Sequence, residues 1–185
     1  MSTDSIGDAL LGLDGQQRPR LESQPLHRRT QLVDKELPVK ISAEDKELTE
    51  AIPVQVNPQY SSNIYNLLMS WQGHVARIRS ELDLPDSDTS IWGVHDLKAT
   101  LIIRDFNERP LGLIESSTRE KVEAILSEID QLFRSYTEED PRNMIDYIDS
   151  DEPDPGRGWW WNRIPVRGPI RRELDVIYGR FQRRI

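Results

Sequence analysis

Three consecutive tryptophans, Trp159 to Trp161, lie between glycines and prolines close to the C-terminus and are followed by an arginine-rich segment. Residues 157–185 contain eight arginines, no lysine and two acidic residues, so their net charge is +6. Residues 1–156 contain 16 basic and 30 acidic side chains, so their net charge is −14. Tryptophan and arginine are favoured anchors of protein interfaces, and they also stack on nucleic-acid bases and contact phosphates. The segment therefore predicts a binding site for another macromolecule.

Three interpretations of this segment are open: it docks onto a protein, it binds a nucleic acid, or it caps the end of a helical body. In the last case we expect Arg157 or Arg163 to stack on an indole ring, in a contact of about 0.5–2 kcal/mol. The acidic run over residues 138–154 can neutralise the neighbouring basic segment within the same molecule, which favours a protein partner over a nucleic acid. The predicted contact residues are Trp159, Trp160, Trp161, Arg163, Arg167, Arg171 and Arg172.

A second candidate site consists of His74 and the pair His95-Asp96, which begins 21 residues further on. An aspartate, Asp146 or Asp149, follows 50 or 53 residues after Asp96. Imidazole and carboxylate groups held on helices can bind a divalent ion that activates water.

This pattern resembles the HD-type metal-dependent phosphohydrolases, which place a histidine on one helix, a His-Asp pair on the next and an aspartate further on. The resemblance covers residues 74–149 and implies an all-helical fold with a site for Mn²⁺, Fe²⁺ or Ni²⁺. The chain departs from the family in lacking the glycine that usually follows the pair, and Gly93 lies in the short helix before it.

Other catalytic patterns are missing from the sequence. The chain has no cysteine, which removes disulfides, thiolate nucleophiles and cysteine metal sites. It contains neither a glycine-rich phosphate loop nor a Gly-x-Ser-x-Gly motif. We therefore expect a non-enzymatic adaptor or assembly protein without a cofactor. A nucleic-acid-binding accessory protein and an HD-type phosphohydrolase are the alternatives.

The composition restricts the setting of this protein. The net charge of −8 argues against coating of nucleic acid over the whole surface. No apolar run approaches the ~20 residues that a membrane span requires, and the N-terminus lacks the basic and apolar parts of a secretory signal. A cytoplasmic protein without a membrane partner is expected. The 19 arginines against five lysines are typical of a high-GC bacterial or phage source.

Apolar residues at steps of three and four predict an all-α fold with three core helices, over residues 61–82, 90–106 and 117–136. Ser61 and Ser62 are expected to cap the first helix, and Ser117 with Glu120 to form a capping box on the third. The β-branched run from Thr100 to Ile103 is also compatible with a strand. Because the connections are short, the helices should form a small antiparallel bundle.

Four regions follow from these patterns. Residues 1–58 form a mostly irregular arm, with an amphipathic segment at 4–13, a linker at 15–40, a short helix at 42–51 and an extended stretch at 53–58. Residues 59–137 form the helical core. Residues 138–156 contain a short acidic helix, capped by Asp140, and a hinge. Residues 157–185 form the Trp/Arg-rich loop and a final helix that begins at Pro169.

Overall fold

The computed structural model describes residues 39–85, 87–88, 90–148 and 157–183. The predicted amphipathic segment at 4–13, the linker up to residue 38 and the hinge after Ser150 lie outside the described residues.

The described part of the chain is mostly helical, as predicted, but it also contains two small antiparallel sheets. A purely α-helical fold was therefore too coarse a prediction. The helices are α1 (Ala43–Glu50), α2 (Ile64–Ser80), α3 (Val94–Glu108), α4 (Ser116–Ser135) and α5 (Pro169–Gln182). The strands are β1 (Pro53–Asn57), β2 (Tyr60–Asn63), β3 (Thr137–Glu139) and β4 (Arg163–Pro165). Short 3₁₀ helices are η3 (Arg109–Gly112), η4 (Met144–Tyr147) and η5 (Trp159–Asn162).

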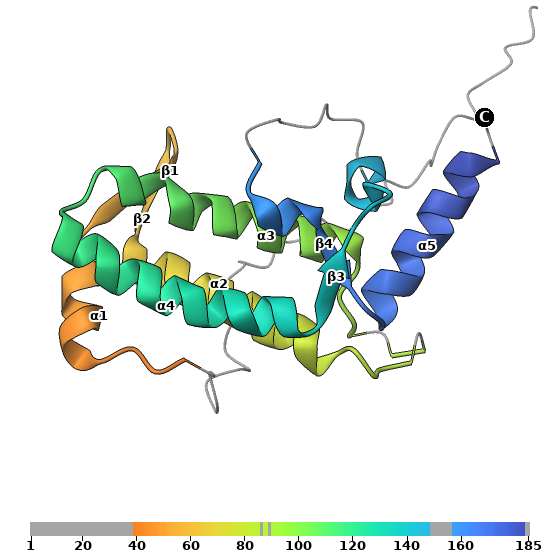
Figure 1. Ribbon diagram of the computed structural model, residues 1–185, viewed down its shortest axis with the longest axis horizontal. Helices are drawn as coiled ribbons and strands as arrows, with labels where there is room; N and C mark the ends of the chain where they lie inside the picture. Colours follow the sequence, from red (N-terminus) through yellow and green to blue (C-terminus); the bar gives the residue numbers. More distant parts are fainter. Residues whose placement is uncertain (1–38, 86, 89, 149–156, 184–185) are drawn as a thin grey trace, which may run out of the picture. The chain divides into compact units, whose positions relative to one another are not determined.

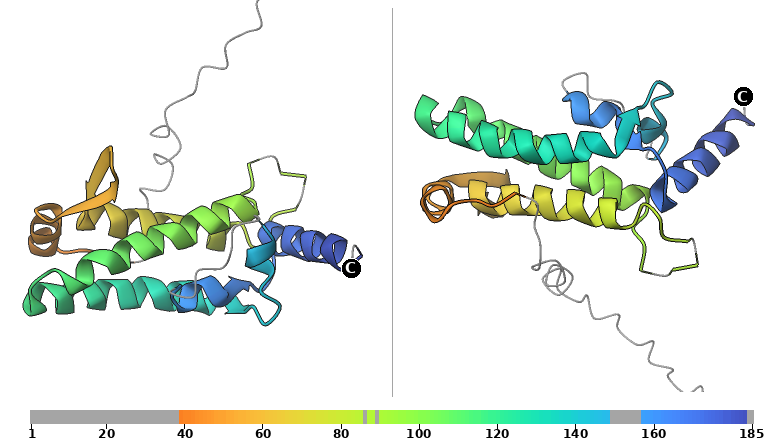
Figure 2. Two further views of the ribbon diagram at one scale, coloured as in Figure 1. Left: turned by 90° about the horizontal axis from the view of Figure 1, so that it is seen from above. Right: turned by 60° about the horizontal axis from the view of Figure 1, so that its bottom comes forward.

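Helices α2, α3 and α4 form the bundle, with α3 running antiparallel to the other two (Figures 1 and 2). The apolar stripe predicted for α2 is buried, and so are Val94, Leu97 and Leu101 of the α3 stripe and Val122, Leu126, Ile129 and Phe133 of the α4 stripe, whereas Ile91 and Phe106 are only partly buried. The segment from Thr100 to Ile103 is helical rather than a strand, because Leu97 and Leu101 on the same face of α3 are fully buried. The largest fully buried side chains of the bundle are Ile64, Leu68, Trp71, Ile78, Leu97, Leu101, Leu126, Ile129 and Phe133.

Two predicted helix starts are wrong. Ser61 and Ser62 belong to β2, which pairs with β1 so that Val54 lies opposite Ser62, and Asn63 caps α2 instead. The Asn63 side chain accepts a hydrogen bond from the backbone N–H of Asn66 at 2.8 Å. Helix α4 begins at Ser116, so Ser117 is already inside its first turn and cannot act as the cap.

The second sheet connects the C-terminal segment to the end of α4. Strand β3 pairs with β4, so that Thr137 lies opposite Pro165. After β3 the chain forms the short 3₁₀ helix η4 where a short acidic helix was predicted, and the Asp140 carboxylate accepts a hydrogen bond from the backbone N–H of Ile145 at 3.2 Å. Helix α5 begins at Pro169, as predicted, and extends beyond the ends of α2 and α4 at an angle to them (Figures 1 and 2).

Candidate functional site

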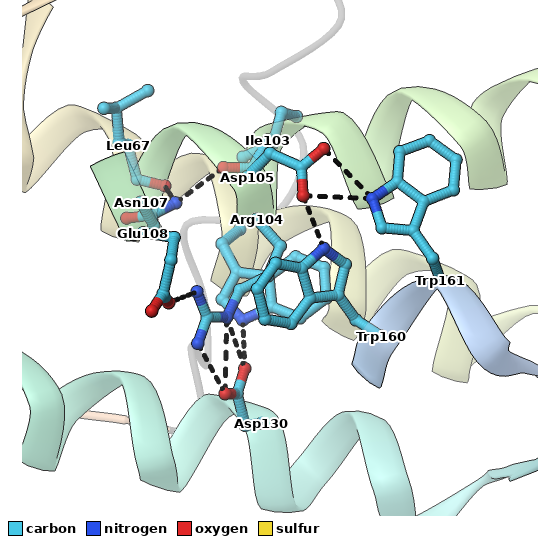
Figure 3. Close-up of polar contacts among 10 residues, drawn as sticks. Leu67, Ile103, Arg104, Asp105, Asn107, Glu108, Asp130, Trp160 and Trp161 are labelled. Atoms are coloured by element: carbon cyan, nitrogen blue, oxygen red, sulfur yellow. Dashed lines mark hydrogen bonds and ion pairs between the residues drawn. The ribbon is translucent and has the colours of Figure 1, made fainter. Parts of the chain in front are cut away.

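The tryptophan cluster is largely inside the protein. The side chains of Trp160 and Trp161 are only 5% and 9% exposed, and Trp159 is partly buried against Phe133. The indole N–H groups of Trp160 and Trp161 both donate to the carboxylate of Asp105 on α3, at 2.8 and 3.0 Å (Figure 3). One acidic side chain therefore satisfies two buried indole donors and holds the loop against the bundle.

Each of the three indole rings also lies under a guanidinium group. Arg134 lies 3.6 Å from the ring centroid of Trp159, Arg104 lies 4.3 Å from Trp160, and Arg157 lies 4.1 Å from Trp161. These are cation–π distances. The stacking predicted for Arg157 in the end-cap interpretation is therefore present.

A buried ion pair lies beneath the cluster. Arg104 of α3 and Asp130 of α4 are 5% and 7% exposed, and the Arg104 Nη2 atom is 3.0 Å from the Asp130 Oδ2 atom. The indole N–H of Trp71 donates to the same aspartate at 3.0 Å. Burial lowers the pKa of Arg104, but hydrogen bonds with Asp130 and Glu108 outweigh it, so the pKa is raised overall. The ion pair links α3 to α4, and the Trp71 hydrogen bond adds α2. Arg104 and Asp130 lie next to the Trp160 ring (Figure 3).

The four predicted contact arginines all make interactions within the chain. Arg163 donates to the hydroxyl and the carbonyl of Thr137, and Arg167 pairs with Asp83, with 2.8 Å between Nε and Oδ1. Arg171 pairs with Glu138 and Asp175, and Arg172 donates to the carbonyl of Leu84 at 2.9 Å. The acidic run contributes two partners to the basic segment: Glu138 for Arg171 and Asp146 for Arg157. The predicted neutralisation within one molecule is confirmed for these two pairs.

An open groove of about 540 Å³ lies beside this anchored segment, between α5 and the residues that precede α3. Its apolar part includes Trp92, which is partly buried and packs on the His74 ring at 5.0 Å between centroids. Val176 of α5 is 50% exposed. The groove is lined by Ile91, Trp92, Gly93, Pro169, Arg172, Glu173, Val176, Ile177 and Arg180.

Only Arg172 of the predicted contact residues lines this groove. Sequence reasoning missed Trp92 because it stands alone before α3, outside any periodic stripe. Val176 was missed because it lies outside the apolar spacing of Ile170, Leu174 and Ile177 in the final helix. An isolated tryptophan in a loop rich in turn-forming residues was the one available signal.

The predicted metal ligands do not form a site. In the described part of the chain, no three histidine, aspartate or glutamate side chains are placed to hold a metal ion. The Nδ1 atom of His74 lies 2.7 Å from the Ser70 carbonyl, whereas His95 is exposed on α3. The Asp96 carboxylate accepts a hydrogen bond from the backbone N–H of Gly93 at 2.9 Å. The convergence of His74, His95 and Asp96 implied by the HD-type resemblance is therefore wrong, and Asp149 lies outside the described residues.

Among the helices of the described residues, none is long and apolar enough to cross a membrane. Comparison of the chain with known protein families, with characterised proteins and with solved structures gives no match.

Proposed function

We propose that this chain is a non-enzymatic helical adaptor or assembly protein that binds another protein through its C-terminal segment. The observation that supports the proposal is the groove between α5 and Trp92, with Val176 half exposed in its wall. In this proposal the buried Trp160 and Trp161 anchor the segment to the bundle, and the outer face of α5 makes the contact.

The composition of the groove suits a protein interface. Its apolar part comes from Trp92, Val176 and Ile177, and arginines Arg172 and Arg180 also line it. Protein interfaces commonly combine an apolar centre that contains aromatic residues with a polar rim, and arginine is enriched in them. The inner side of α5 already packs in the core through Leu174, which is fully buried. A partner can therefore use the outer face without displacing α5 from the bundle.

A nucleic-acid partner is less well supported. Phosphate contacts would have to compete with Asp83 for Arg167 and with Glu138 for Arg171, because those acids already pair with the two arginines. Nucleic-acid binding also weakens steeply with salt. The logarithm of the binding constant falls linearly with the logarithm of the salt concentration, with a slope of about −0.7 to −0.9 for each phosphate contact. A protein interface built on apolar side chains loses far less affinity when the salt concentration rises, because charges at its rim mainly change the association rate.

Site-specific photo-crosslinking in the organism of origin tests this proposal. A photoreactive amino acid is placed at position 176 of the full chain and, as a matched control, at position 166, because Val166 is similarly exposed (40%) but does not line the groove. We expect a nuclease-resistant crosslink to a defined protein from position 176 and none from position 166. Equal products from both positions, or nuclease-sensitive products from position 176, would contradict the proposal.

A further inference from the structure

The side chain of Arg104 takes part in two interfaces at once. All three of its guanidinium nitrogens donate to carboxylates of the bundle: Nε and Nη2 to Asp130 at 3.0 Å each, and Nη1 to Glu108 at 2.8 Å. The face of the same group lies over the Trp160 ring in η5, with 4.3 Å between Cζ and the ring centroid (Figure 3). The bundle therefore uses the edge of the guanidinium plane, and η5 uses its face.

The orientation of the Arg104 plane depends on the packing of three helices. Two parallel hydrogen bonds to one carboxylate fix the plane of a guanidinium group as well as its position. Asp130 belongs to α4 and also accepts a hydrogen bond from the indole N–H of Trp71 on α2 at 3.0 Å. Sliding α4 by one turn along α3 would move Asp130 by about 5.4 Å, well outside hydrogen-bond distance of Arg104.

The Arg104–Asp130 ion pair is a poor source of stability for the bundle. The two residues are only 5% and 7% exposed, and the loss of hydration at such a site offsets most of the attraction between the charges. Neutral or apolar replacement of a buried ion pair is therefore often neutral or stabilising. A fully hydrogen-bonded buried network instead favours one arrangement of its neighbours over others.

We infer that the Arg104–Asp130 pair is a docking lock: it presents the guanidinium face to Trp160 only when α2, α3 and α4 are in register, and so makes docking of η5 depend on the packing of the bundle. Asp105, the next residue of α3, completes the contact by accepting the N–H groups of Trp160 and Trp161. Trp160 is then held at its ring face and at its N–H by two consecutive residues of one helix. This inference does not rest on the proposed function.

Hydrogen exchange of the indole N–H groups, followed by NMR on the full chain, tests the docking lock. Trp71 donates to Asp130 inside the bundle, and Trp160 and Trp161 donate from η5, so their exchange rates report the two parts separately. Arg104→Lys keeps the charge beside Asp130 but loses the parallel hydrogen bonds and the planar face. We expect protection of Trp160 and Trp161 to fall about tenfold or more, while protection of Trp71 changes by less than about threefold.

Arg134→Lys is the matched control. Arg134 is exposed and stacks on the neighbouring Trp159 ring, with 3.6 Å between Cζ and the ring centroid. The control makes the same chemical change in the same cluster, at a guanidinium that lies over another ring. It should leave the protection of Trp160 and Trp161 within about twofold of the unmodified chain.

A second variant tests the energetic argument. Arg104→Met combined with Asp130→Asn removes both charges and keeps an oxygen that can accept the Trp71 N–H. It should show the same selective loss of protection in η5. Its urea midpoint should be at or above that of Asp130→Asn alone, in which Arg104 stays buried without the Asp130 charge.

Three results would overturn the inference. A parallel fall in protection at all three tryptophans of Arg104→Lys would mean that Arg104 supports only the overall stability. Unchanged protection, or an equal loss in Arg134→Lys, would mean that docking of η5 does not depend on this guanidinium. If Arg104→Lys does not fold, the double variant decides by the same comparison. Failure of the double variant to fold as well would show that the bundle requires the ion pair, which contradicts its role as a docking lock.

Discussion

The carboxylate of Glu173 accepts a hydrogen bond from the backbone N–H of Val94, 79 residues earlier in the chain, at 2.9 Å. A side chain of α5 thereby caps the N-terminus of α3. A Cβ atom on Gly93 would lie 2.7 Å from the Glu173 Oε2 atom, so a side chain at position 93 would push this carboxylate out of its present position.

Removing this cap should destabilise the fold moderately. Glu173→Ala is expected to lower the free energy of unfolding by about 1 kcal/mol, the usual effect of losing an N-terminal cap. Gly93→Ala should displace the Glu173 carboxylate and should therefore lower the free energy of unfolding through loss of the same hydrogen bond. In urea titrations the free energy of unfolding of the double variant should therefore fall by less than the sum of the two single-variant losses. Strict additivity would show that the two residues are not coupled.

Removing Asp105 is expected to destabilise the fold more than removing Glu173, because the Asp105 carboxylate accepts hydrogen bonds from two buried indole N–H groups. Asp105→Ala should lower the free energy of unfolding by about 2–3 kcal/mol, since the N–H groups of Trp160 and Trp161 lose a charged acceptor. The tryptophan emission should shift to longer wavelength as water reaches the rings. Asp105→Asn keeps one acceptor oxygen and should lose about half as much. Asp175→Asn, which changes an exposed partner of Arg171, is the control and should cost less than about 0.5 kcal/mol.

Two glycine-to-alanine substitutions should have opposite effects. Gly168 has a φ of 96°, and a Cβ atom there would lie 2.9 Å from the Cα atom of Leu82. Gly168→Ala should therefore cost about 2 kcal/mol, because both the backbone conformation and the space oppose a side chain. Gly179 lies inside α5 with nothing within 4 Å of its Cβ position. Gly179→Ala should raise the free energy of unfolding by about 0.5–1 kcal/mol. Thermal unfolding of both variants measures the difference, and a shift of the same sign in both would refute the prediction.

Stability should fall in mild acid partly because of His74. Burial lowers the pKa of this imidazole below its ordinary value of 6.5, although the Ser70 carbonyl and the Asp96 charge oppose the shift. Above 6.5 the ring is neutral in both the folded and the unfolded chain, so it adds no pH dependence. Below 6.5 the unfolded chain binds the proton first, so the free energy of unfolding falls until the pH passes the lowered pKa of the folded state.

His74→Gln should remove the part of the pH dependence of stability that is due to His74. Urea titrations of the unmodified chain and the variant, from about pH 8 to pH 5, give the difference in slope. The difference between the two chains isolates His74 from the carboxylates that titrate at lower pH. Parallel profiles would mean that the imidazole titrates alike in the folded and unfolded chain.

Local patterns in the sequence determined most of the helices. The apolar steps of three and four in α2, α4 and α5 identify the face that each helix buries, because the period of an α-helix is a local property. Pro169 marked the start of α5 for a similarly local reason: proline lacks a backbone N–H and suits the first turn. The acidic and basic runs likewise predicted charge pairing near the C-terminus, which Arg171 and Glu138 confirm.

Only the tertiary structure decided where the tryptophans point. Trp160 and Trp161 are as suitable for an interface as for a core, and their burial depends on Asp105, 55 and 56 residues away in sequence. The strands β3 and β4, of three residues each, are too short to show a period, so their pairing was invisible as well. The metal hypothesis failed for the same reason, because a His-Asp spacing does not reveal that His95 lies on the exposed face of α3. Contacts between distant segments depend on how the helices pack against one another. Local sequence patterns do not reveal that packing, because it depends on all the segments at once.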